Sequence, residues 1–163
     1  MKKSLALDTS KLVVYIAQEV INTLISHQQI KEDSHEVAGV FVGEIYPEEH
    51  TIIIKKAIVT HEENGSRYNV NLDIKKLQRM IDQEWLKSGK TLLYLGEWHT
   101  HPEAFPSPSL IDYLTFSGNY FTSRFAQNIL IYTIIGVEKD TFSSMWIRTY
   151  NGLLFRKANV FIL

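Results

Sequence analysis

The chain has 163 residues, of which 45% are hydrophobic and 12% aromatic, and this composition predicts one folded domain over residues 1–163 with a core of its own. Its net charge of −1 excludes the strongly basic surface that nucleic-acid binding requires. Cysteine is absent, which excludes a disulfide scaffold, a thiol nucleophile and a Cys-ligated zinc site, so any bound metal has to use His and carboxylate ligands.

The first half of the chain predicts a strand, a helix and a hairpin. A β-branched run predicts a strand over 12–16, and apolar residues at spacings of three and four predict a helix over 17–27. Two further apolar runs predict strands over 37–45 and 51–59, paired as a hairpin across residues 46–50. Gly39, inside the first of these strands, indicates a place where the backbone lies close to a neighbour. A polar loop around Asn64-Gly65 follows.

The second half predicts two helices and four strands. Helical spacing covers residues 71–87 and is ended by Ser88-Gly89, and an almost wholly apolar strand covers 92–98. A short helix is predicted from Ser109 to about Phe116, followed by closing strands over 128–137, 142–149 and 153–161. The expected architecture is an α/β (α+β) domain with a curved mixed sheet flanked by helices.

The chain carries no apolar run near the ~20 residues that span a bilayer. Asp8 and Lys11 interrupt the apolar opening that follows Lys2-Lys3, before it reaches the length of a signal peptide. The sequence therefore predicts a soluble cytoplasmic protein without membrane or nucleic-acid partners.

One motif in the chain has the residue types and spacing of a catalytic metal site. His99 and His101 are one residue apart on an extended segment, so their side chains face the same way. Asp112, eleven residues further on, can return on a helix and complete a His2Asp ligand set. Three protein ligands leave the fourth tetrahedral position of zinc open for water, which is typical of catalytic sites.

The order His-x-His-Pro, six residues, Ser, two residues, Asp resembles the JAMM motif of the JAB/MPN family. The distant glutamate of that motif has a match in Glu36, which Gly39 and Gly43 follow at the family's offsets. The resemblance runs from about Lys11 to the end. It is closest to small bacterial stand-alone members, among them the deconjugating peptidase of CBASS antiphage operons.

The resemblance implies a single MPN domain that acts as a zinc-dependent peptidase or isopeptidase. The bond hydrolysed would lie at the C-terminus of a ubiquitin-like or otherwise conjugated protein, such as the product of a neighbouring E1/E2-like system. The resemblance assigns His99, His101 and Asp112 to Zn²⁺ and Glu36 to the general base and acid. It assigns Ser109 to stabilisation of the oxyanion, for which capping of the helix is an equal alternative.

Two other functions stay open at this point. One is a JAB hydrolase acting on the C-terminal adduct of a sulfur-carrier protein, and the other is a metal-free MPN scaffold. Scaffold members typically lose ligand residues, whereas this chain keeps every position of the motif. The stretches 60–68 and 117–127, which match the ubiquitin-gripping insertions of eukaryotic relatives, are short here.

Several residues near the motif have more than one interpretation. Glu97 lies on the same face as the two histidines and is expected to be solvated or to face substrate rather than to orient a ligand. Trp98 points to the opposite face and is expected in the core. The aromatic residues of the 117–127 stretch are candidates for either substrate contact or packing: Tyr120, Phe121 and Phe125. The remaining histidines are expected at the surface without a role: His27, His35, His50 and His61.

Overall fold

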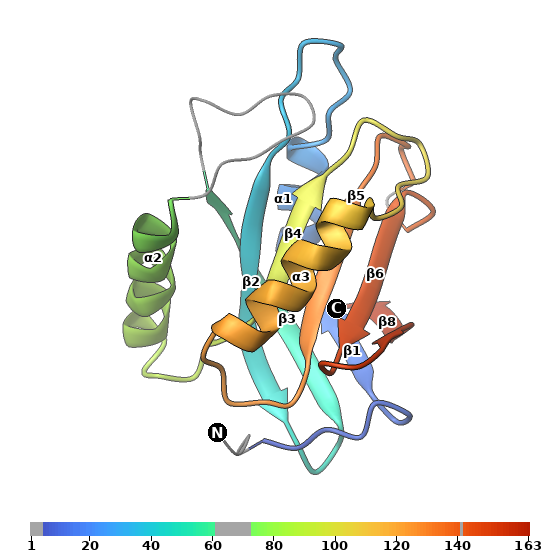
Figure 1. Cartoon of the computed structure of the whole chain (residues 1–163). Coiled ribbons are helices and arrows are strands. Elements are labelled where there is room, and N and C mark those ends of the chain that lie inside the picture. Colours follow the sequence, from blue (N-terminus) through green and yellow to red (C-terminus); the bar gives the residue numbers. More distant parts are fainter. Residues whose placement is uncertain (1–4, 61–72, 141) are drawn as a thin grey trace.

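The computed structural model describes residues 5–60, 73–140 and 142–163, which form one mixed sheet and three helices (Figure 1). The sheet order is β7-β6-β5-β4-β2-β3-β1-β8. The strands are β1 (Val13–Ile16), β2 (Ala38–Tyr46), β3 (Thr51–Thr60), β4 (Leu93–Thr100), β5 (Leu130–Ile135), β6 (Met145–Tyr150), β7 (Phe155–Arg156) and β8 (Asn159–Ile162). The helices are α1 (Gln18–Ser26), α2 (Ile74–Lys87) and α3 (Leu110–Thr122). None of the described helices has the length and apolar content needed to cross a membrane.

The helices divide between the two faces of the sheet. On one face, α1 buries its apolar side against β1, β3 and the inward residues of β4 and β5, which gives the largest core cluster. On the other face, α2 packs on β2 and β3, and α3 packs through Phe116 on β5 and β6. In Figure 1, α2 lies to one side of the sheet, next to β2, and α3 crosses obliquely in front of the central strands.

Gly39 makes room for the largest buried side chain in the sheet. It pairs directly with Trp98 across the β2–β4 ladder, and the indole lies over the glycine. A Cβ at residue 39 would lie 2.8 Å from Trp98 Nε1 and 1.9 Å from the carbonyl oxygen of Ile58. Trp98 is 1% exposed, as expected of a core residue. The prediction of a close approach at Gly39 is confirmed.

A bulge in β4 changes which of its side chains share a face. The β2–β4 register shifts where Gly96 pairs with Phe41 and Tyr94 pairs with Val42, so Leu95 has no partner of its own on β2. Gly96 has φ 147°, and a Cβ there would lie 1.8 Å from the carbonyl oxygen of Ile131. Because of the bulge, Tyr94 joins the face toward α2 and α3, whereas strict alternation from residue 97 would put residue 95 there.

The predicted elements are mostly present within one to three residues of their expected bounds, and the hairpin of β2 and β3 is confirmed. For α2, Asp73 accepts a hydrogen bond from the backbone N–H of Lys76 as the N-cap, so the helix begins at Ile74 rather than at residue 71. Residues 61–72, with the loop predicted around Asn64 and the first two residues of that predicted helix, lie outside the described residues.

Two predicted elements were wrong in extent. Helix α3 continues past Phe116 to Thr122, and Tyr120 attaches this last part of the helix to the sheet, since its hydroxyl donates to the carbonyl of Asn128. The single strand predicted over 153–161 is two strands. Strand β7 turns back onto β6 at Gly152, which has φ 91°, and β8 pairs with β1 instead.

The split between β7 and β8 shows how strongly the sheet curls. The two strands are at opposite edges of the sheet order, yet Arg156 and Asn159 are only three residues apart. Three residues span at most about 11 Å, so the two edges of the sheet come close together. The expected curved mixed sheet is confirmed.

Replacement of Gly39 by alanine is expected to destabilise the protein by about 2 kcal/mol or more, because the new methyl group has to displace Trp98 and the neighbouring strand. Gly118→Ala is the matched control: it adds the same methyl group in open space within a helix and is expected to stabilise by about 0.5–1 kcal/mol. Urea unfolding of both variants measures the two values, and equal effects would contradict the packing role of Gly39.

Candidate metal centre

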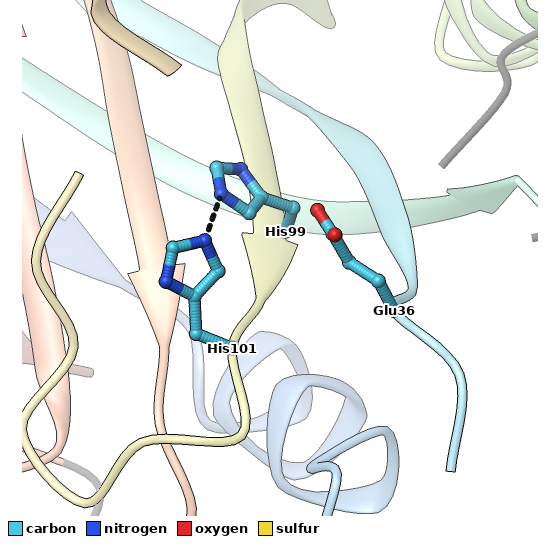
Figure 2. Close-up of side chains that lie close together, drawn as sticks. All are labelled: Glu36, His99 and His101. Carbon is cyan, nitrogen blue, oxygen red and sulfur yellow. Dashed lines mark hydrogen bonds between the residues drawn. The ribbon is translucent and has the colours of Figure 1, made fainter. Parts of the chain in front are cut away.

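Three side chains converge at the end of β4 and the start of α3. The Nε2 atoms of His99 and His101 are 3.1 Å apart. Asp112 Oδ1 lies 3.3 Å from His99 Nε2, and its Oδ2 lies 3.5 Å from His101 Nε2. Glu36, from the segment before β2, brings its carboxylate within 4.8 Å of both imidazoles (Figure 2). The structure therefore brings together all four of these predicted site residues.

The spacing of the two histidine nitrogens and the Asp112 carboxylate is close to the spacing of zinc ligands. Tetrahedral zinc holds its ligands at about 2.0–2.1 Å, which places two ligand atoms about 3.3–3.4 Å from each other. The two histidine nitrogens are 3.1 Å apart, and each faces a different oxygen of Asp112: Oδ1 lies 3.3 Å from His99 Nε2, and Oδ2 lies 3.5 Å from His101 Nε2. Glu36 is further away: its carboxylate lies within 4.8 Å of the imidazole nitrogens but forms no ion pair with either of them within 4.0 Å. The residues present can hold a metal in the His2Asp arrangement.

Asp112 is fixed by the cap of its own helix. Ser109 is the N-cap of α3: its hydroxyl accepts from the backbone N–H of Asp112 at 3.1 Å. In return, the hydroxyl and the backbone N–H of Ser109 each donate to Asp112 Oδ2 at 2.7 Å. Burial alone would raise the pKa of Asp112, but the hydrogen bonds from His99 and Ser109 and the charge of His99 together lower it. This carboxylate is thus held ionised and pointed at the two histidines.

Ser109 in this structure uses its hydroxyl to cap the helix and orient Asp112. The single hydroxyl proton points at Asp112 Oδ2, and the residue is exposed at the edge of the site. Capping is therefore observed, and stabilisation of an oxyanion stays a prediction.

The position of Glu36 follows from Thr100, the residue between the two histidines. Thr100 exchanges two hydrogen bonds with Val37: its backbone N–H donates to the Val37 carbonyl at 2.9 Å, and its hydroxyl accepts from the Val37 N–H at 3.0 Å. The hydroxyl proton goes to Gln29 Oε1 at 3.0 Å. Thr100 and Gln29 are almost fully buried. The residue after Glu36 is therefore fixed to the strand that carries the histidines, and neither Thr100 nor Gln29 was singled out from the sequence.

Burial gives Glu36 and His101 protonation properties that suit metal chemistry. Desolvation raises the pKa of Glu36 to about 7, against the opposing effect of His99 and with a further rise from Asp112. Desolvation, with the neighbouring His99, lowers the pKa of His101, so its imidazole is neutral and available as a metal ligand at neutral pH. A carboxyl group with a pKa near 7 can both accept and release a proton.

The converging side chains lie in a long groove of about 1420 Å³ between α2 and α3. Its floor is formed by β2 and β4, and its walls come from the facing sides of the two helices. The lining includes apolar residues of both helices and of β2: Val40, Ile74, Leu77, Ile81, Trp85, Ile111 and Phe116. A groove of this shape can hold an extended peptide whose end reaches the metal centre.

Glu97, expected to be solvated or to face substrate, is only partly exposed, so it is not a fully solvated side chain at the mouth of the site. It is partly buried on the groove floor, where it accepts hydrogen bonds from Tyr94 and from Asn119 of α3. Burial raises the pKa of Glu97, against the effect of these hydrogen bonds and of the charge of His99. No hydrogen bond joins it to either metal-site histidine among the described residues.

The other residues with alternative interpretations are now placed. Tyr120 and Phe125 pack against each other with ring centroids 5.1 Å apart, and Phe125 also lines the groove. Phe121 is 69% exposed. His27 is not a plain surface residue, because its Nδ1 lies 2.8 Å from the Thr23 carbonyl and its ring packs on Trp98. His35 is exposed, His50 is half-buried and His61 lies outside the described residues.

Comparison with known proteins gives a family and named relatives. A family model for prokaryotic homologs of the JAB domain matches residues 18–148. The chain is 33% identical over 105 residues to a protein named CD-NTase/cGAS isopeptidase from Vibrio cholerae serotype O1, a match that covers 64% of this chain and 67% of that protein. A protein of the same name from Escherichia coli strain TW11681 is 36% identical over 101 residues, covering 61% of this chain and 63% of that protein. The matches thus leave about a third of each relative uncovered.

Among solved structures, the chain resembles the solution structure of protein DSY2949 from Desulfitobacterium hafniense. The TM-score is 0.64 at 15% sequence identity, and the match covers 92% of both chains. At this identity the likeness shows the fold alone.

The pKa of Glu36 predicts a pH dependence for the metal-free protein. Because the folded-state pKa is about 7 and the ordinary value is 4.5, burial of this carboxyl group becomes progressively more costly as the pH rises from 4.5 through 7. Glu36→Gln removes that cost. We expect the variant to gain about 1–2 kcal/mol of stability relative to the unchanged chain between pH 5 and pH 8, after allowance for partial exposure.

Chemical unfolding in the presence of a chelator, at both pH values, measures this difference. Glu48→Gln, which changes an exposed carboxyl group on the β2–β3 turn, is the control for the general effect of removing a charge. An equal effect of Glu36→Gln at pH 5 and pH 8 would contradict the assignment of a buried, raised-pKa carboxyl group to residue 36.

Proposed function

Since the chain belongs to the family of prokaryotic homologs of the JAB domain, we propose that it is a zinc-dependent isopeptidase that releases a conjugated protein from the bond at its C-terminus. Two relatives that are a third identical to this chain are named CD-NTase/cGAS isopeptidase, which makes a conjugated CD-NTase the favoured substrate. The resemblance of the motif to CBASS-associated members supports a role in a cytoplasmic antiphage conjugation system, beside an E1/E2-like enzyme.

The observation that carries the proposal is the convergence of two imidazoles and the Asp112 carboxylate, with contacts of 3.1 to 3.5 Å, in a peptide-sized groove. His99, His101 and Asp112 would hold the zinc ion. When bound, zinc supplies Lewis acidity, which polarises a carbonyl group and lowers the pKa of a coordinated water toward ~7.

Glu36 would move the proton in this reaction. Its carboxylate accepts a proton from water as the water oxygen forms a bond to the scissile carbonyl carbon. It then donates that proton to the amine nitrogen as the carbon–nitrogen bond breaks. The products are the free C-terminal carboxylate of the released protein and the amine of its former partner. The pKa near 7 suits both steps, because the group must hold the proton between them.

The remaining residues would prepare the site for this step. Thr100 fixes the segment that carries Glu36, and Ser109 orients Asp112. The Ser109 hydroxyl, at the edge of the site, would also stabilise a developing oxyanion, which is the role that the family resemblance assigns to it. The groove would hold the extended C-terminal tail of the protein that is released.

A cleavage experiment tests the proposed function directly. The CD-NTase from the same genome is joined through its C-terminus to a lysine of a reporter protein, and a second substrate carries the same junction as a linear fusion. We expect the zinc-loaded enzyme to cut at the junction and chelation to abolish the cut. Cleavage of a sulfur-carrier protein adduct, with both CD-NTase substrates intact, would instead favour the sulfur-carrier hydrolase, and a zinc-loaded protein that cuts none of them would contradict catalysis.

Single substitutions separate the role of Glu36 from those of the ligands. Glu36→Ala is expected to lower turnover by about 10²–10⁴-fold with the metal retained, because it removes only the proton carrier. His101→Ala and Asp112→Ala are expected to lose both metal and turnover. Metal content by mass spectrometry and cleavage rates are measured together, with Glu48→Ala as a remote carboxylate control. Equal metal loss in all three site variants would contradict the role given to Glu36.

A further inference from the structure

Glu97 lies on the floor of the groove, beside the metal centre but outside it. It is two residues before His99 on β4 and faces the same side of the sheet, since strand side chains alternate. Two strand residues correspond to about 6.6 Å. Consider an extended substrate tail whose last carbonyl carbon reaches the metal centre. The side chain that lies over Glu97 would then belong to a residue about two positions before the cleaved bond.

The carboxylate of Glu97 is held still by its neighbours. Tyr94 donates its hydroxyl proton to Oε1 at 3.1 Å, and Asn119 Nδ2 lies 2.9 Å from both Oε1 and Oε2. The bulge in β4 brings Tyr94 to this face, and Asn119 faces the groove on α3, seven residues after Asp112. A carboxylate has about four acceptor positions, so these three contacts leave one of them, on Oε2, for a ligand.

No positive charge of the protein balances this carboxylate within the described part of the chain. There, no lysine, arginine or histidine nitrogen lies within the 4.0 Å of an ion pair with Glu97. A buried carboxylate is costly unless it is paired. If its only task were to join β4 to α3 through Asn119, a neutral glutamine would serve as well, because its amide oxygen also accepts hydrogen bonds. A glutamate, unlike a glutamine, can also offer the open acceptor position on Oε2 to a cation from outside the chain.

Among the described residues, most of the charged side chains that line the groove are acidic. They are Glu36, Asp82, Glu97, Glu103 and Asp112, and the described lining also includes Arg124. Glu36 and Asp112 belong to the metal centre, where a bound ion would offset their charge. Of the others, Glu97 is the one fixed on the floor next to that centre.

We propose that Glu97 selects a lysine or arginine side chain of the substrate tail, about two residues before the bond that is cleaved. This inference rests on the proposed isopeptidase function and narrows its substrate class to proteins with a basic residue near the C-terminus. The cation occupies the free acceptor position of Oε2, and Tyr94 and Asn119 keep the carboxylate oriented toward it. Glu97 is thus a specificity-determining residue, separate from the proton carrier Glu36.

A panel of tails tests the inference. Each substrate is the CD-NTase joined through its C-terminal tail to a reporter, with lysine, arginine, glutamine or glutamate placed in turn at each of the last four positions. For the intact zinc-loaded enzyme, we expect kcat/KM to be about tenfold higher for lysine or arginine than for glutamine at one position, two or three residues before the junction. Glutamate at that position is expected to be the poorest.

Three variants separate charge from position. Glu97→Gln keeps an acceptor for Asn119 and Tyr94. For this variant we expect the ratio of kcat/KM between lysine and glutamine tails to fall below about two. Asn119→Ala keeps the charge but loosens its support, so the preference is expected to remain even if kcat falls. Asp82→Asn removes another acid of the same groove and is expected to keep the full preference. Thermal unfolding of each variant verifies that it is folded.

The inference is overturned if the intact enzyme shows no preference for a basic residue at any of the four positions, or if that preference survives in Glu97→Gln. Should the intact enzyme cut no member of the panel, the proposed function fails, and binding still decides the inference. Free tail peptides with lysine or glutamine are then titrated into zinc-loaded Glu36→Ala protein, with and without Glu97→Gln. Tighter binding of the lysine peptide that depends on Glu97 sustains the inference, and equal binding overturns it.

Discussion

The arrangement of the metal centre depends on the pair of hydrogen bonds between Thr100 and Val37. Two segments more than sixty residues apart in the sequence each contribute to the site, and this pair fixes one to the other at the point where both leave the sheet. Gln29, which follows α1, accepts the proton of the Thr100 hydroxyl and so completes the hydrogen bonds of that group. Because these partners are buried, water does not compete for the contacts. The carboxylate of Glu36 is thereby placed against the histidines without a direct bond to either.

The second half of the site is formed by the N-terminus of α3, where one carboxylate both caps the helix and faces the histidines. The same carboxylate of Asp112 that closes the capping box of α3 also faces His99 and His101. The helix is attached to the sheet by Phe116 in the aromatic core and, one turn further, by Asn119 on Glu97. Local helix capping and tertiary packing thus favour the same orientation of the Asp112 carboxylate. A preorganised site is obtained in this way from short-range contacts.

Much of this was accessible from the sequence, for identifiable reasons. The spacing of His99, His101 and Asp112 reflects strand alternation and a helix start, both of which are local rules, and these residues do meet in the structure. The bulge beside Gly96, the buried role of Thr100 and the pairing of β8 with β1 were missed. Each of these features depends on the order of the strands in the sheet, which local sequence rules do not give. The extension of α3 to Asn119 could have been found from the seven-residue spacing to Asp112, which puts both on one helix face.

The pairing of β1 with β8 has a consequence for how the chain folds. Val13 lies beside Asn159, so the sheet is completed by a contact between segments separated by almost the entire sequence. Contacts of such long sequence separation are formed at a high entropic cost of loop closure, and a high contact order is associated with slow folding. During synthesis, the edge of β1 stays uncovered until β8 has been made. Until then β1 presents unpaired backbone N–H and C=O groups. A chaperone or a neighbouring chain can bind to these groups during that period.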